Sequence, residues 1–315
     1  MARMPASTST RHPVLDAIGH TPLVRLERLA TPEMAEVWVK LEANNPTGSY
    51  KDRMALAMIE GAERDGRLQP GQTVVEYTGG STGSSLALIC ALKGYPLRIV
   101  SSDAFAAEKA KTMRVFGADV ELIHSPEGVT KDLVSRMMAR AGEIVAETGG
   151  FATDQFNNHD MLAGYATLGR EILEQLPDAA DAFVLYVGTA GCFVGTTRVL
   201  RRQWPALHRT VVEPAESPFL SEGWAGTHGI EGGGPGFWPP LLTRDDFDAI
   251  VTVSTEEAYA MARRAAREDG IFSGVSFGAT LNATLQVARR LGPGHRVVTV
   301  QVDSGLKYLS GPTYR

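Results

Sequence analysis

Residues 44–53, which read NNPTGSYKDR, decide the fold because a strand turns into a helix there. The chain alternates apolar and polar residues over 37–41, as a half-buried strand does. Pro46 and Gly48 then favour a turn. Apolar and small residues follow at helical spacing over 54–61. We therefore expect a strand, a turn and a helix start in immediate succession.

Lys51 stands in the first turn of this expected helix. Ser49 is the predicted N-cap, and its spacing to Asp52 resembles a capping box with the shorter acid. The positive end of the helix dipole opposes an ammonium group there, and burial would lower the pKa of Lys51 further. A neutral, nucleophilic amine of this kind suits a Schiff base. The alternative is an ordinary solvated surface lysine.

Composition favours a globular protein that acts on small molecules. The chain has 315 residues, enough for two domains, with 43% hydrophobic and 21% charged residues. A net charge of −5 predicts no nucleic-acid partner and no anionic membrane surface. Two cysteines far apart in the sequence, Cys90 and Cys192, form no disulfide framework, which fits a reducing cytoplasm. The seven histidines lack the spacing of zinc ligands, so no metal is expected. Residues 1–11 are predicted to be a disordered tail.

From residue 73 onward, strand patterns alternate with helix patterns. Strands are expected at 73–77, 97–101, 120–123, 183–187, 210–213, 250–253 and 297–302. Helices are expected at 84–92, 107–116, 131–146, 161–175, 256–267 and 279–291. This rhythm predicts an α/β fold with parallel sheets. Residues 214–243 interrupt it with many glycines and prolines, so we expect a functional or mobile loop there.

Two glycine-rich turns follow expected strands. Residues 78–83, TGGSTG, offer main-chain amides and three hydroxyls at a helix start, which suits a carboxylate or phosphate. A plain strand-to-helix turn uses the same residues. Residues 188–195, GTAGCFVG, form the better phosphate site, although they match neither a P-loop nor a dinucleotide fingerprint. Glu213, at the end of the next strand, keeps a nicotinamide dehydrogenase among the alternatives.

A third turn, residues 274–279, places Ser276 before a helix. Its hydroxyl is a candidate partner for a ring nitrogen, and capping of the helix is the alternative. One lysine, two anion sites and this hydroxyl together describe a site for pyridoxal 5′-phosphate.

With these motifs the chain resembles the fold-type II pyridoxal-phosphate enzymes, in the cysteine synthase and cystathionine β-synthase group. The resemblance runs from residues 19–24, GHTPLV, to residues 303–310, DSGLKYLS. It implies a tryptophan synthase β-like fold of two three-layer α/β domains with mostly parallel sheets. It also implies a smaller mobile domain at 47–157, a larger domain from 12–46 plus 158–315, and a homodimer.

The resemblance assigns the catalytic Schiff-base role to Lys51 and contacts to two further sets of residues. The implied cofactor contacts are Lys51, Ser81, Gly188, Thr189, Ala190, Gly191, Cys192 and Ser276. The implied substrate contacts are Thr78, Gly79, Gly80, Ser81, Thr82, Gln155 and Gly232. Residues 229–236 resemble a glycine-rich segment beside the substrate.

Four positions depart from the family pattern. Gly79 replaces a serine, which predicts more room beside the substrate carboxylate, and Ser81 replaces an asparagine with a shorter side chain. Ala190 and Cys192 replace a glycine and a threonine, so the main-chain amides should carry more of the phosphate binding.

The GSYKDR segment resembles β-replacement enzymes more than dehydratases, which usually have a phenylalanine before the lysine. The implied reaction is replacement on an activated serine-type amino acid, in which sulfide or another small nucleophile adds to an aminoacrylate. The alternatives are β-elimination, as in a serine or threonine dehydratase or a desulfhydrase, and racemisation on the same fold. A nicotinamide dehydrogenase and a cofactor-free binding protein are the alternatives from other classes.

Overall fold

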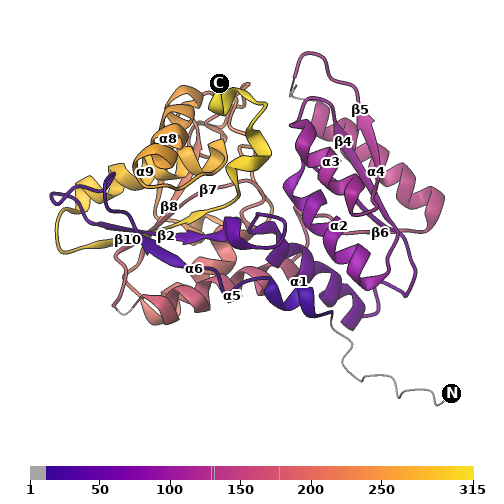
Figure 1. Cartoon of the computed structure of the whole chain (residues 1–315), viewed down its shortest axis with the longest axis horizontal. Helices are drawn as coiled ribbons and strands as arrows, with labels where there is room; N and C mark the ends of the chain where they lie inside the picture. The colour runs from indigo at the N-terminus through magenta and orange to yellow at the C-terminus, as the bar shows by residue number, and fades with distance from the viewer. Residues whose placement is uncertain (1–11, 129, 131, 177) are drawn as a thin grey trace.

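The computed structural model describes residues 12–128, 130, 132–176 and 178–315, and in them two sheets stand side by side (Figure 1). The six-stranded sheet has the order β1-β2-β10-β7-β8-β9, and the four-stranded sheet has the order β5-β4-β3-β6. The predicted α/β class with mostly parallel sheets is confirmed. The domain boundaries at 47 and 157 stay a prediction, and the predicted tail at 1–11 lies outside the described residues.

The large sheet is the middle layer of three. Its strands are β1 (Leu23–Arg25), β2 (Glu36–Leu41), β7 (Ala182–Tyr186), β8 (His208–Pro214), β9 (Ala249–Val253) and β10 (Arg296–Gln301). β1 is antiparallel to β2, and the other pairs are parallel. The helices α5 (Asp160–Gln175) and α6 (Gly191–Gln203) cover one face, and α8 (Thr255–Glu268) and α9 (Val275–Leu291) cover the other. Along β7, Phe183 and Leu185 pack toward α6, whereas Ala182 and Val184 pack toward α9.

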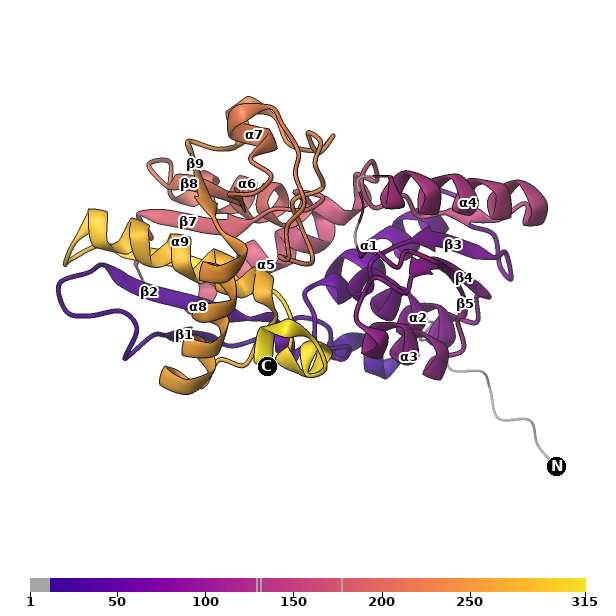
Figure 2. The same cartoon turned by 90° about the horizontal axis from the view of Figure 1, so that it is seen from above.

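The small sheet has the same three-layer plan. Its parallel strands are β3 (Val74–Tyr77), β4 (Leu97–Ser102), β5 (Asp119–Ile123) and β6 (Phe151–Ala152). The helices α2 (Ser81–Lys93) and α3 (Ala107–Val115) cover one face, and α4 (Leu133–Thr148) covers the other. Between the two sheets lies α1 (Lys51–Arg64), which contacts both α2 and α5 (Figure 2).

Most predicted elements are found within two or three residues of their expected bounds. The sequence patterns missed β1, β6 and the one-turn helix α7 (Phe219–Glu222), because each is too short to show periodicity. Helix α2 begins at Ser81 rather than at residue 84, so part of the predicted glycine-rich loop is a helical turn. Lys131, where a helix was expected to begin, lies outside the described residues, and α4 begins at Leu133.

The start of α1 differs from the predicted capping box. The helix begins at Lys51, whose N–H donates to Ser49 Oγ at 3.2 Å. The Asp52 carboxylate accepts hydrogen bonds from the N–H and hydroxyl of Thr47 and from Ser85 Oγ at 2.6 Å. The predicted pairing of Asp52 with Ser49 is therefore wrong, because Asp52 joins the preceding turn to α2.

A buried ion-pair network fixes α1 on the large sheet. Arg53 donates to both oxygens of Glu42 at 2.8 Å and to both oxygens of Glu171 at 2.6 and 2.8 Å. Lys40 Nζ lies 2.7 Å from Glu171, and the side chains of Arg53, Glu42 and Lys40 are at most 2% exposed. Burial alone would raise the pKa of Glu171, but the hydrogen bonds and charge of Arg53 hold it at about 2. Two cations and two anions thus balance one another.

Replacement of Arg53 by leucine should destabilise the protein strongly, because two buried carboxylates lose a partner. We expect the free energy of unfolding to fall by about 3–5 kcal/mol in urea titrations. Arg64→Leu is the matched control on the same helix, since its side chain is 68% exposed, and it should change stability little. Equal losses in the two variants would contradict this account of the network.

Candidate active site

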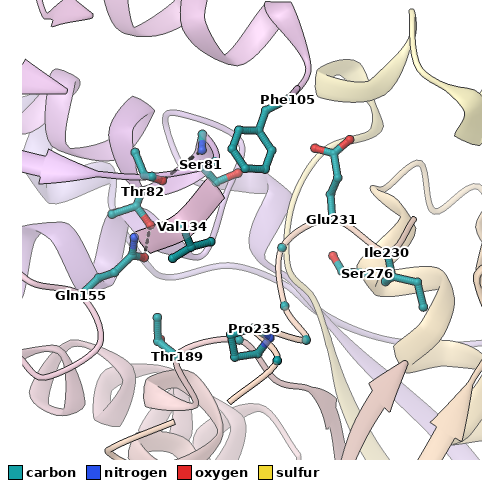
Figure 3. A pocket seen from close by; sticks show the side chains of 18 of the residues that line it. Ser81, Thr82, Phe105, Val134, Gln155, Thr189, Ile230, Glu231, Pro235 and Ser276 are labelled. Carbon is teal, nitrogen blue, oxygen red and sulfur yellow. Dashed lines mark hydrogen bonds between the residues drawn. The ribbon is translucent and has the colours of Figure 1, made fainter. Parts of the chain in front are cut away.

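A cavity of about 970 Å³ lies between the two sheets and collects most of the predicted site residues. Its lining includes Lys51, residues 78–82, Gln155, Gly188, Thr189, Gly232 and Ser276. Ala190, Gly191 and Cys192 are buried and are not among the lining residues. Figure 3 shows Ser81, Thr82 and Gln155 on one side of the cavity and Ser276, Ile230 and Glu231 on the other.

The turn before Lys51 is held by the segment that follows β10. Tyr50 donates its N–H to the carbonyl of Val302, and Ser304 donates its N–H to the carbonyl of Gly48, both at 3.0 Å. Gly48 has a φ of 71°, a left-handed conformation that favours glycine. The lysine therefore enters the cavity from a fixed turn.

The Lys51 amine is buried without an acidic partner. Its side chain lines the cavity although the residue is only 8% exposed. The Nζ atom lies 3.8 Å from Met54 Sδ and 5.0 Å from the centre of the Tyr50 ring. Among the described residues no carboxylate forms an ion pair with it. Burial lowers the pKa of Lys51 to about 8, so about one fifth of the amine is neutral near physiological pH.

The segment from Thr78 to Thr82 joins β3 to α2 and faces this amine across the cavity. Thr78 Oγ1 accepts a hydrogen bond from the Gly80 N–H at 3.0 Å. Thr82 Oγ1 donates to Gln155 Oε1 at 2.8 Å, and Gln155 Nε2 donates to the carbonyl of Tyr77 at 3.1 Å. Two segments that were predicted to hold one carboxylate are thus hydrogen-bonded to each other.

Glu76 orients Gln155 and was missed by the sequence analysis. Its carboxylate accepts hydrogen bonds from Thr153 Oγ1 at 2.6 Å, from the Gln155 N–H at 3.2 Å and from the Tyr77 N–H at 2.9 Å. Burial raises the pKa of Glu76 to about 7, despite these hydrogen bonds. The available signal was an acid inside the apolar strand β3, where every residue is buried.

Neighbouring side chains explain two departures from the family pattern. A Cβ on Gly79 would lie 3.0 Å from the Phe105 ring, so Phe105 occupies the space that a side chain would need. The prediction of more room at Gly79 is therefore wrong. Ser81 Oγ accepts a long hydrogen bond of 3.5 Å from Lys307 Nζ, and burial lowers the pKa of Lys307. The Lys307 side chain thus approaches Ser81, whose side chain is shorter than the asparagine of the family pattern.

The second predicted anion site lies where β7 runs into α6, and it offers main-chain amides. Gly188 and Thr189 line the cavity, and Ala190 follows with a φ of 63°. This left-handed residue turns successive N–H groups toward one side, at the start of a 13-residue helix whose first N–H groups have no intrahelical partner. The Cys192 thiol lies 4.0 Å from Thr196 Oγ1, and burial raises its pKa to about 12.

Ser276 lies in the first turn of α9 and is 4% exposed. The N-cap of α9 is Gly274, whose N–H donates to Asp303 Oδ1 at 3.2 Å. The alternative prediction that Ser276 caps this helix is therefore wrong, and its side chain lines the cavity. A Cβ on Gly232 would lie 3.6 Å from Ser276 Oγ, which places the glycine-rich segment beside this hydroxyl.

An ion pair that the sequence analysis missed crosses the cavity. Lys109 of α3 lies 2.6 Å from Glu231, which precedes Gly232 in the glycine-rich segment. The Lys109 side chain is 5% exposed, packs against Gly80 and places its Nζ 4.5 Å from the centre of the Tyr308 ring. The pair joins the small sheet to the loop of the large one.

Glu213, the acid that supported a nicotinamide enzyme, has another role. Its carboxylate accepts hydrogen bonds from the N–H groups of Leu220 and Ser221 and from Ser221 Oγ, at 2.5 to 3.0 Å. Glu213 therefore caps α7 and is not among the residues that line the cavity.

The described part of the chain has neither a metal-binding cluster nor a membrane-spanning helix. Within residues 12–128, 130, 132–176 and 178–315, no three His, Cys, Asp or Glu side chains gather where they could hold a metal ion. Over those residues, too, every helix is too short or too polar to cross a bilayer. Cys90 and Cys192 are free and buried.

Comparisons with known proteins agree with this geometry. The family described as "Pyridoxal-phosphate dependent enzyme" matches residues 14–303. A cysteine synthase of Staphylococcus aureus strain Mu50 is 39% identical over 100% of this chain and 99% of its own length. The crystal structure of an O-ureido-L-serine synthase superposes with a TM-score of 0.90 at 35% identity, over 96% of this chain and 94% of that one. An O-acetylserine sulfhydrylase of Entamoeba histolytica superposes with a TM-score of 0.89 at 34% identity, over 100% and 94%.

The lowered pKa of Lys51 predicts a pH dependence of stability in the cofactor-free protein. Between pH about 8 and the ordinary lysine pKa of 10.5, the unfolded chain binds a proton that the folded chain lacks. Raising the pH through this window should therefore stabilise the wild type relative to Lys51→Met. Urea unfolding at several pH values measures the difference. A difference that does not rise from pH 8 to 10.5 would refute the buried, unpaired amine.

Glu76→Gln should weaken substrate binding, because an amide cannot accept all three hydrogen bonds that the Glu76 carboxylate accepts, one of which comes from the Gln155 N–H. We expect the KM for the amino-acid substrate to rise about tenfold, with a smaller change in kcat. Glu63→Gln is the control, since Glu63 lies on the outer part of α1 and pairs with Lys93. An unchanged KM in Glu76→Gln would remove the assigned positioning role.

Proposed function

The chain belongs to the family of pyridoxal-phosphate dependent enzymes, and from this premise we propose that it replaces the acyloxy group on the β-carbon of an O-acylated serine with a small nucleophile such as sulfide. The family match and the cysteine synthase relatives confirm the predicted resemblance and the predicted cofactor. One observation carries the proposed site: the buried Lys51 amine has no acidic partner among the described residues and opens onto a cavity lined by both glycine-rich segments.

The residues that are present fit pyridoxal phosphate. Lys51 offers an amine, the main-chain N–H groups around Ala190 offer a phosphate site, and Ser276 offers a neutral hydroxyl to the ring nitrogen. When bound, the cofactor supplies an aldehyde that links to amines and a ring that withdraws electrons from the substrate α-carbon. Ser81, which Lys307 approaches, is the proposed side-chain contact to the ring oxygen.

The segment from Thr78 to Thr82 is the proposed site for the substrate carboxylate. Its glycine N–H groups need no side chain to act as donors, so recognition survives the replacement of serine by Gly79. Gln155 closes this site from beyond the end of the neighbouring parallel strand β6, because Thr82 and Glu76 hold it there. Gly232 is the proposed contact on the large-sheet side.

Lys51 is the proposed general base. With a pKa of about 8, its neutral form takes the proton from the substrate α-carbon and returns a proton there at the end of the reaction. Approach of the small sheet to the large one would exclude water from the cavity, and the pair of Lys109 and Glu231 already joins the two sides.

Elimination and racemisation use the same first proton transfer and stay alternatives to replacement. Steady release of a keto acid without an added nucleophile would identify elimination. The nicotinamide alternative loses its support, because the Glu213 carboxylate is committed to α7.

We propose further that the enzyme acts in the cytoplasm as a homodimer. The two buried free cysteines support a reducing compartment. Exposed apolar side chains of Val115, Leu306 and Leu309 support an interface, since a second copy would cover them. Analytical ultracentrifugation of the holoenzyme tests the dimer.

Lys51→Ala should abolish both covalent attachment of the cofactor and turnover. In the wild type, borohydride reduction should fix pyridoxal phosphate to the peptide that contains Lys51, as mass spectrometry detects. With O-acetylserine and sulfide, cysteine formation should fall by about 10³-fold in Lys51→Ala. Lys111→Ala, an exposed lysine of α3, is the control and should retain both properties. A wild type that neither binds the cofactor nor changes its absorbance with any O-acylserine would refute the proposal.

A further inference from the structure

The cavity has an apolar lobe beside the small sheet, in addition to the residues proposed to hold the cofactor and the substrate carboxylate. Its volume of about 970 Å³ lies at the upper end of the range for drug-sized ligands. The lobe is the part of the cavity bordered by Tyr77, Phe105, Val134, Phe156 and Phe237. The first four belong to the hydrophobic cluster that also packs Met137 of α4 against β3.

Aromatic rings connect this lobe across the two halves of the protein. Tyr77 and Phe156 are stacked with ring centres 6.4 Å apart and planes 12° apart. Phe156 in turn contacts Phe237 of the glycine-rich loop, with ring centres 5.1 Å apart. Phe105, Phe156 and Phe237 are only partly buried, so their rings present apolar surface to the cavity.

The Tyr77 hydroxyl is the polar group of the lobe that lacks a partner. It is buried and has no hydrogen-bond partner among the described residues. Burial raises its pKa, so the hydroxyl stays protonated and available as a donor. Tyr77 directly precedes the proposed carboxylate segment, so a group beside Tyr77 would be a neighbour of the substrate.

Phe105 and Val134 flank that same segment. Phe105 packs on Gly79, and Val134 lines the same cavity. Figure 3 shows Phe105 and Val134 on the side of the cavity that carries Ser81 and Thr82. The side opposite, at Ser276 and Gly232, is assigned to the cofactor ring. The lobe therefore remains for the organic part of a second substrate.

We propose that this lobe binds the nucleophile, and that the nucleophile class is a thiol or amine that carries an aromatic ring with a hydrogen-bond acceptor. The inference rests on the proposed β-replacement. For a thiol, the net reaction forms the sulfur–Cβ bond and breaks the Cβ–oxygen bond. The acyloxy group leaves with the bonding electron pair, and the thiol proton reaches the departing carboxylate through solvent.

Competition between nucleophiles tests the proposal in the holoenzyme with O-acetylserine as donor. We expect kcat/KM for 4-methoxybenzenethiol, whose ether oxygen is the acceptor, to exceed that for methanethiol, and its rate to saturate. Val134→Trp fills the lobe, and Tyr77→Phe removes the donor. Each variant should lower the ratio of kcat/KM for 4-methoxybenzenethiol to that for sulfide by about tenfold. Tyr95→Phe is the control, because its hydroxyl pairs with Glu63 away from the cavity.

A binding experiment separates failure of the lobe from failure of the reaction. Calorimetry with 4-methoxyphenol, which has the same ring and ether with a hydroxyl in place of the thiol, should detect binding to the wild-type holoenzyme and about tenfold weaker binding to Val134→Trp. The proposal of an aromatic nucleophile is overturned if both proteins bind the ring with equal affinity. It is also overturned if the two variants leave the ratio of kcat/KM for the aromatic thiol to that for sulfide unchanged. Binding that depends on Val134 in a protein that turns over no O-acylserine supports the lobe while refuting the proposed reaction.

Discussion

Three consecutive residues at the start of α1 make separate contacts, and the position of the active site depends on them. Lys51 enters the cavity, Asp52 accepts hydrogen bonds from the turn and from Ser85 of α2, and Arg53 binds Glu42 and Glu171 on the large-sheet side. One helical turn thereby joins both sheets and carries the reactive amine between them. Because Arg53 and Asp52 are buried and fully partnered, the amine has little freedom to move away from the cavity.

The same turn accounts for an amine that is buried and uncharged in part. A lysine buried alone would unfold the local structure or recruit an acid, since a buried ammonium is costly. Here Arg53, two residues after Lys51, stabilises α1 through its ion pairs with Glu42 and Glu171. These ion pairs offset the unfavourable burial of Lys51 without placing a carboxylate beside its amine. The separation of the stabilising charges from the reactive amine keeps the pKa of Lys51 low.

The sequence predicts the long periodic elements and the turns at strand ends, because both depend on local patterns. It also predicts that Lys51, Ser276 and the two glycine-rich turns lie close together, since their chemistry describes one cofactor site and ligands bind at the carboxyl ends of strands. That the two turns belong to different sheets, which face each other across the cavity, does not follow from the sequence. The contacts of Glu76, Phe105 and the pair of Lys109 and Glu231 could not be predicted. They join residues from separate elements, and no spacing along the chain records which side chains meet across a cavity.

The replacement of serine by Gly79 illustrates how tertiary contacts change the meaning of a substitution. From the sequence it removes a side chain and enlarges the site, whereas in the structure Phe105 fills that volume. The hydroxyl of a serine at position 79 is thus exchanged for the aromatic ring of Phe105, while the main-chain N–H donors of residues 78–82 are retained. Main-chain atoms suffice to hold a carboxylate, so under the proposed assignment the change leaves donor recognition intact and alters the surface proposed to meet the incoming nucleophile. Specificity in this chain is therefore expected to differ from that of its relatives on the nucleophile side of the reaction.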